Sequence, residues 1–182
     1  MTVKRMTQLS LLTAAALILY VIELQLPSPV PIPGVKLGLA NIITVIAVYR
    51  FRPCETAMLV TARVILGAFF AGNLSAMLFS GCGAAFCLCG MLLLKRVIDM
   101  RYLPLCSILG AMLHNAGQMA AAVWVMQSTS VLVYLPILTV TGGIAGLFTG
   151  LCARAVERRL PSDIGINHDP EQKNHEKTFK NM

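Results

Sequence analysis

Long apolar runs, separated by short polar or charged connections, make up most of the chain. Six runs are predicted to be helices that cross a membrane: residues 7–26, 37–49, 54–71, 75–94, 103–127 and 131–155. Most come close to the roughly 20 residues that span a bilayer as a helix. Helices are favoured because a lipid-exposed backbone must satisfy its own hydrogen bonds, and no run alternates as a barrel strand does. The pattern predicts an all-α bundle of six transmembrane helices.

Basic residues mark one predicted side of this bundle. Those that fall on that side are Lys4, Arg5, Arg50, Arg52, Lys95, Arg96, Arg101, Arg154, Arg158 and Arg159. The connections on the other side carry only Lys36. Because cytoplasmic loops are rich in Lys and Arg, both termini are predicted to be cytoplasmic. If residues 37–49 formed a re-entrant loop, the later basic residues would lie on the opposite side of the membrane from Lys4 and Arg5. A short true crossing is therefore favoured.

The composition agrees with an integral membrane protein. Of the 182 residues, 57% are hydrophobic and 13% charged, with a mean hydropathy of +0.73; a soluble domain is far more polar. The net charge of +7 does not indicate a nucleic-acid partner, because the basic residues are scattered and lack interleaved aromatic residues. Residues 1–160 are predicted to form the membrane domain, and residues 161–182 a disordered cytoplasmic tail.

No metal site or cofactor is predicted. The six cysteines form no CxxC pair and have no histidine at metal-ligand spacing, so they are expected to be small apolar packing residues. His168 and His175 lie in the polar tail without a second cluster of ligands, so they are expected to be solvated.

Arg63 is the most unusual residue of the apolar runs. It lies about halfway along residues 54–71, and a charge near the bilayer centre costs roughly 2.5–3.5 kcal/mol. Two explanations fit the sequence. Glu23, at the outer end of the first helix, could neutralise Arg63, or Arg63 could contact a ligand.

Further polar residues gather in the predicted outer half. His114, Asn115 and Gln118 share one face of residues 103–127, since residues three and four apart are neighbours on a helix. Asn73 follows the third run. Such side chains often only hydrogen-bond a neighbouring helix. Together with Arg63, however, they predict a solute site that opens to the outside.

The connection 26-LPSPVPIPGVKLGLAN-41 lies on the predicted outer side. Prolines at alternate positions restrict the backbone and favour a stiff, extended strap. Lys36 stands at the N-terminal end of the second helix, where an anion is favoured, and Asn41 follows about one turn deeper. A lid that offers Lys36 and Asn41 to a solute and a rigid connector both fit these residues.

The stretch 33-PGVKLGLAN-41, the small-residue run 13-TAAA-16 and six crossings in a short chain resemble the Gx transporter group. That group is related to the S components of energy-coupling factor (ECF) importers, and its members are often described as heptaprenyl diphosphate synthase component I. The resemblance covers about residues 7–160. It implies an S-component-like subunit, in a bacterial plasma membrane, that binds a vitamin-like or anionic metabolite. The candidate solute contacts, chosen from the polar residues above, are Lys36, Asn41, Arg63, Asn73, His114, Asn115 and Gln118.

The resemblance also implies partners. An S component associates with a transmembrane coupling protein and a pair of ATPases, and it docks through small residues of its first helix. The candidate docking residues here are Ser10, Thr13 and Ala14. Close helix packing inside the chain would explain the same small residues.

The synthase description raises a second hypothesis. No two acidic residues are adjacent, so the chain lacks the aspartate-rich pairs that hold a diphosphate through Mg²⁺. GxxxxGK[ST], GxSxG and HExxH motifs are also absent. The chain is therefore predicted not to be an enzyme. As an alternative to the importer subunit, it would be a membrane accessory to a catalytic prenyl synthase subunit in polyprenyl or quinone metabolism. A third hypothesis is a stand-alone facilitator.

Overall fold

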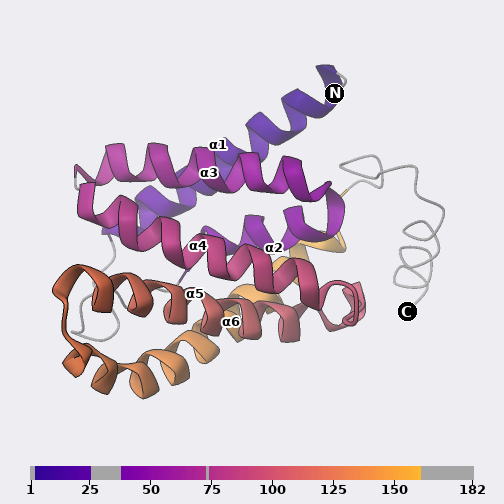
Figure 1. Cartoon of the computed structure of the whole chain (residues 1–182). Coiled ribbons are helices and arrows are strands. Elements are labelled where there is room, and N and C mark those ends of the chain that lie inside the picture. Colours follow the sequence, from indigo (N-terminus) through magenta and orange to yellow (C-terminus); the bar gives the residue numbers. More distant parts are fainter. Residues whose placement is uncertain (1–2, 26–37, 73, 161–182) are drawn as a thin grey trace.

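The computed structural model describes residues 3–25, 38–72 and 74–160, and this part of the chain is all helical (Figure 1). The α-helices are α1 Val3–Gln25, α2 Asn41–Arg50, α3 Pro53–Ala71, α4 Leu74–Leu94, α5 Leu103–Met126 and α6 Leu135–Glu157. Short 3-10 helices, η1 Met100–Tyr102 and η2 Thr129–Tyr134, precede α5 and α6. The prediction of an all-α bundle is confirmed.

Proline and glycine residues set several of the helix ends. Proline stands in the first turn of α3, α5 and α6, where its missing N–H costs no intrahelical hydrogen bond. Gly72 ends α3 in the left-handed conformation, with φ of 62°. These signals are local in the sequence. The predicted limits of the third, fourth and fifth runs therefore lie within two residues of the ends of α3, α4 and α5.

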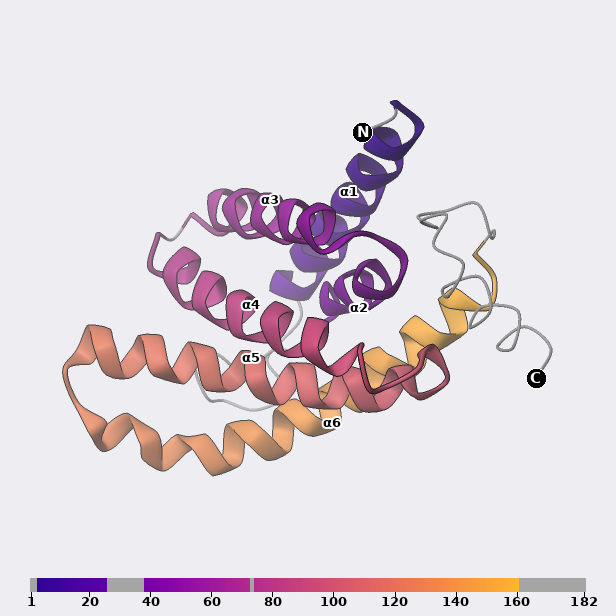
Figure 2. The same cartoon turned by 45° about the vertical axis from the view of Figure 1, so that its right-hand side comes forward.

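Helix α2 forms the centre of the bundle (Figure 2). It is apolar on all sides, and every residue from Ile42 to Arg50 is buried. The five longer helices all contact it, α1 and α3 on one side and α4, α5 and α6 on the others. A helix that is hydrophobic all round is expected to be buried in this way. Its predicted start at residue 37 was too early, because residues 38–40 form a turn before Asn41.

Helices α4, α5 and α6 pack closely through glycines (Figure 1). A Cβ atom on Gly117 of α5 would lie 2.7 Å from the carbonyl oxygen of Cys82 and 3.0 Å from the Cα of Gly83 on α4. One on Gly146 of α6 would lie 2.8 Å from the Cα of Ile108 on α5. Small residues let membrane helices approach until their backbones touch. The three helices therefore form one tightly packed layer against α2.

Polar contacts fasten the C-terminal end of α2. Arg50 donates from Nε to Glu157 Oε1 at 2.7 Å, and both side chains are 2% exposed. Lys95 donates to the carbonyl of Val48 at 2.8 Å, and burial lowers the pKa of Lys95. Tyr49 donates to the carbonyl of Ile98 at 3.1 Å. Positive groups at a helix C-terminus also complement its dipole. These contacts join α2 to α6 and to the α4–α5 connection.

Four helical segments in the described ranges are long and apolar enough to cross a membrane, within α1, α3, α4 and the η2–α6 region. Helix α2 is too short, and the polar residues His114, Asn115 and Gln118 lower the hydropathy of α5. The protein is therefore a helical membrane protein. Six crossings and cytoplasmic termini stay predictions, and the predicted tail, residues 161–182, lies outside the described residues.

Candidate functional site

Arg63 on α3 meets Asn41 on α2 inside the bundle. The arginine is 7% exposed and donates from Nη1 to Asn41 Oδ1 at 3.2 Å. Its Nε has no hydrogen-bond partner among the residues that the structure describes. A buried donor without a partner costs free energy, so its presence calls for an explanation. The sequence placed both residues in one predicted solute site, and they contact each other directly, although solute binding by them stays a prediction.

Glu23 on α1 organises the turn that leads into α2. Its carboxylate accepts hydrogen bonds from the backbone amides of Gly38 and, at 3.1 Å, of Leu39. Gly38 has φ of 72°, a conformation that favours glycine. The sequence left open whether Glu23 neutralises Arg63. Their charges interact, but the contacts of Glu23 with both amides show that it holds the turn as well.

Thr44 is a polar residue of this region that the sequence did not single out. It is 2% exposed, and its hydroxyl has no hydrogen-bond partner within the described segments. Threonine in an apolar helix commonly bonds the carbonyl four residues earlier, as Thr13 and Thr139 do here. Thr44 lies three residues after Asn41, and therefore on the same side of α2. A threonine within an apolar run carries no sequence signal that would distinguish this one.

The polar residues of α5 face two different neighbours. His114 and Gln118 lie against Gly83 of α4. Asn115 donates from Nδ2 to the carbonyl of Leu138 on α6. These positions join α5 to α4 and α6, whereas Arg63 and Asn41 join α3 to α2. Their role in solute binding stays a prediction.

Other predicted positions are exposed or lie outside the described residues. Lys36 and Asn73 belong to segments that the structure does not describe. Ser10 and Ala14 are exposed on α1, and Thr13 is half-buried and donates to the carbonyl of Leu9 at 2.8 Å. Ser10 and Ala14 are therefore accessible to a partner helix, and the docking role of all three stays a prediction.

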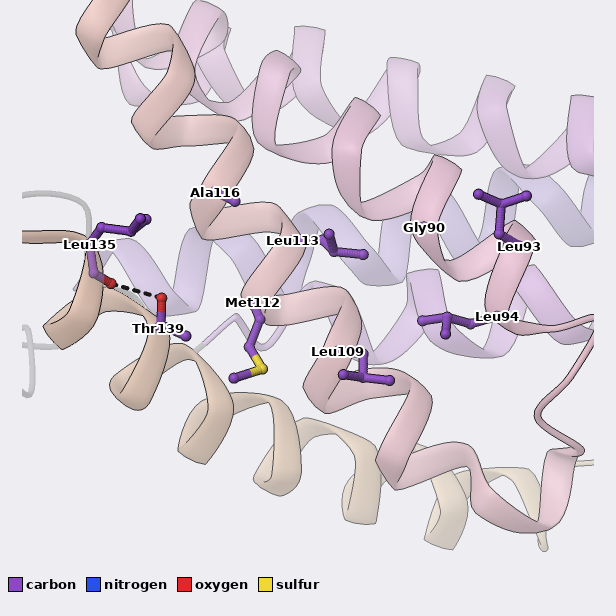
Figure 3. A pocket seen from close by; sticks show the side chains of 9 residues that line it. All are labelled: Gly90, Leu93, Leu94, Leu109, Met112, Leu113, Ala116, Leu135 and Thr139. Atoms are coloured by element: carbon purple, nitrogen blue, oxygen red, sulfur yellow. Dashed lines mark hydrogen bonds between the residues drawn. The ribbon is translucent and has the colours of Figure 1, made fainter. Parts of the chain in front are cut away.

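An open apolar groove runs between α4, α5 and α6 (Figure 3). Its volume is about 560 Å³, which falls in the range of small-molecule sites. The lining residues are Gly90, Leu93, Leu94, Leu109, Met112, Leu113, Ala116, Leu135 and Thr139. The Thr139 hydroxyl donates to the carbonyl of Leu135 at 2.8 Å, so its one donor is already used. The groove suits a hydrocarbon chain better than a polar solute.

The sequence matches the family described as heptaprenyl diphosphate synthase component I over residues 12–156. The chain belongs to this family. The component I match extends from α1 to the end of α6, so it includes both the Arg63–Asn41 pair and the groove. It also agrees with the description attached to the resemblance seen in the sequence. No curated protein and no solved structure matches the chain.

The component I description raises the question of whether this chain could itself bind a Mg²⁺-bound prenyl diphosphate. Mg²⁺ that carries a diphosphate is usually held by one or two carboxylates together with the phosphate oxygens. In the described ranges no three His, Cys, Asp or Glu residues lie close enough to hold a metal ion. Glu55 pairs with Arg5 at 2.8 Å and caps α3, and Glu157 pairs with Arg50. These two carboxylates are therefore engaged in ion pairs with arginines.

Proposed function

We propose that this chain is a membrane component without a catalytic site of its own, which works with a separate catalytic subunit in polyprenyl diphosphate synthesis. The family description carries this proposal, because it names one component of a heptaprenyl diphosphate synthase. The sequence lacks adjacent acidic residues, and a synthase needs carboxylate-bound Mg²⁺. Catalysis would therefore belong to the partner.

The groove between α4, α5 and α6 gives this component a physical role. Leu109, Met112, Leu113 and Ala116 place one face of α5 along it over about 10 Å, at 1.5 Å per residue. Because lipid tails are as apolar as the groove, a branched hydrocarbon would be favoured through van der Waals packing against its surface. The groove is short compared with a long prenyl chain, so it would hold part of the chain while the rest lies in lipid. The subunit would present the growing product to the membrane.

Filling the groove tests this role. Ala116→Phe places a ring in the groove, whereas Ala120→Phe adds the same ring at an exposed position on the same helix. We expect Ala116→Phe to retain about one tenth as much added heptaprenyl diphosphate as the wild type, or less. A tenfold loss of affinity corresponds to about 1.4 kcal/mol of binding free energy. The second variant should behave like the wild type. Native mass spectrometry of the detergent-purified proteins measures the retained lipid, and equal retention by Ala116→Phe and the wild type would reject the role.

A second candidate is the solute-binding subunit of an ECF-type importer. The buried Arg63–Asn41 contact supports it, because a buried guanidinium with an unpartnered Nε is more readily explained by a polar ligand than by packing. This candidate requires a coupling protein and ATPases as partners, and the first requires a catalytic synthase subunit. The two proposals therefore differ in the proteins that should accompany the chain.

A further inference from the structure

Buried polar groups near the start of α2 have hydrogen-bond donors without partners among the described residues. Arg63 has only donors, so the oxygen of the Asn41 side chain must face it, and the Asn41 amide nitrogen is left to donate. The Nε of Arg63 and the hydroxyl of Thr44 are buried without partners among the described residues. The side chains of Arg63, Asn41 and Thr44 can therefore each donate a further hydrogen bond. An acceptor-only group is the natural complement of such a set.

The charges of Arg63 and Glu23 limit which kind of acceptor group a ligand could place here. Arg63 carries one positive charge, and the carboxylate of Glu23 lies near enough to act on it. Both carboxylate oxygens of Glu23 accept from the backbone amides of Gly38 and Leu39, which disperses its charge, so the guanidinium still binds an anionic acceptor more strongly than a neutral one. A dianion would bring excess negative charge next to Glu23, at a high desolvation cost. A single carboxylate brings one negative charge rather than two, and its two oxygens accept from several donors.

We propose that Arg63, Asn41 and Thr44 bind the carboxylate of a small monoanionic ligand. The Arg63 guanidinium supplies the charge, and the Thr44 hydroxyl and the Asn41 amide supply further hydrogen bonds. Thr44 thereby becomes a specificity residue, because it can donate to a carboxylate from the side of α2 that carries Asn41. The inference shares with the importer proposal only the use of this cluster as a ligand site. It requires no ATPase and no transport.

Matched probes test the charge requirement. Acetate and benzoate each have a neutral isostere, acetamide and benzamide, and inorganic phosphate supplies a dianion. We expect at least one carboxylate to raise the melting temperature of the detergent-purified full chain in a saturable way, while its amide and phosphate do not. Equal shifts with a carboxylate and its amide, a larger shift with phosphate, or no shift with either carboxylate would overturn the proposal.

Side-chain replacements test the residues. Arg63→Gln should abolish the carboxylate-dependent shift, and Thr44→Val should weaken the apparent affinity about tenfold, as the loss of one hydrogen bond to a charged group does. Thr44→Val removes a hydroxyl without a described partner, so this variant should fold even if Arg63→Gln does not. Thr149→Val is the control, because it removes a buried hydroxyl that is bonded to Ser107 at 3.0 Å; its affinity should match the wild type. Unchanged affinity in Thr44→Val would contradict the assignment.

The importer proposal and the carboxylate site can be rejected independently of each other. A carboxylate-dependent shift in a protein that associates with no ATPase would reject the importer and keep the site. ATPase partners together with no response to either carboxylate would keep the importer and reject this site.

Discussion

Replacing Glu157 with glutamine is expected to lower the free energy of unfolding by about 3–5 kcal/mol, because it breaks the buried ion pair between Arg50 and Glu157. Both side chains are 2% exposed, and Nε of Arg50 lies 2.7 Å from Oε1 of Glu157. The pair joins the central helix α2 to α6. Its loss should therefore loosen α2 as well as the end of α6. Unfolding by sodium dodecyl sulfate, followed by circular dichroism, measures the change.

Two further variants separate the ion pair from general effects of charge. Arg159→Gln removes an exposed positive charge two residues after Glu157, and it should change the stability by less than about 0.5 kcal/mol. The double variant Arg50→Met, Glu157→Leu should recover most of the loss, because apolar side chains can replace a buried ion pair. A Glu157→Gln protein as stable as the wild type would show that the pair contributes little to anchoring α2.

Adding a methyl group at Gly117 is expected to cost about 1–3 kcal/mol, the usual effect of overpacking. The Cβ of Gly117→Ala would lie 2.7 Å from the carbonyl oxygen of Cys82, 2.9 Å from the Cβ of Phe86 and 3.0 Å from the Cα of Gly83. Two of these three neighbours are backbone atoms, so the helices must move apart to accommodate it.

Gly143 provides the matched control for this effect. A Cβ there meets nothing within 4 Å, so Gly143→Ala should leave the stability unchanged or raise it by up to about 1 kcal/mol through helix propensity. The same detergent unfolding measurement compares the two variants. Equal effects of Gly117→Ala and Gly143→Ala would contradict the close contact of α4 with α5.

Periodicity and composition were sufficient to predict the helices, because hydrophobicity and proline or glycine signals act locally. They could not predict that α2 is the central helix. A short apolar run can be a crossing, a re-entrant segment or a buried core helix, and only the contacts of residues 42–50 with the other five helices show its central position. The early predicted start of α2 has the same origin, since the turn at Gly38 depends on Glu23, fifteen residues earlier.

The candidate site was predicted only in part. Arg63 was conspicuous because a charge in an apolar run is rare, and its contact with Asn41 is observed. The residues of α5 share one helical face in the sequence, yet that face lies between α4 and α6, so it meets two neighbours. Thr44 went unnoticed because threonines in apolar helices are common. The apolar groove also has no sequence signature, since it depends on how three helices pack.

The central claim, a membrane component that depends on a separate catalytic subunit, can be tested by one purification followed by one assay. The tagged chain is isolated from mildly solubilised membranes of its own host and supplied with isopentenyl diphosphate, an allylic diphosphate and Mg²⁺. The account predicts chain elongation when a co-purifying soluble subunit is present, and none after that subunit is washed away with the chain still folded. Elongation by the chain alone would contradict the account, and so would co-purification of only a coupling protein and ATPases.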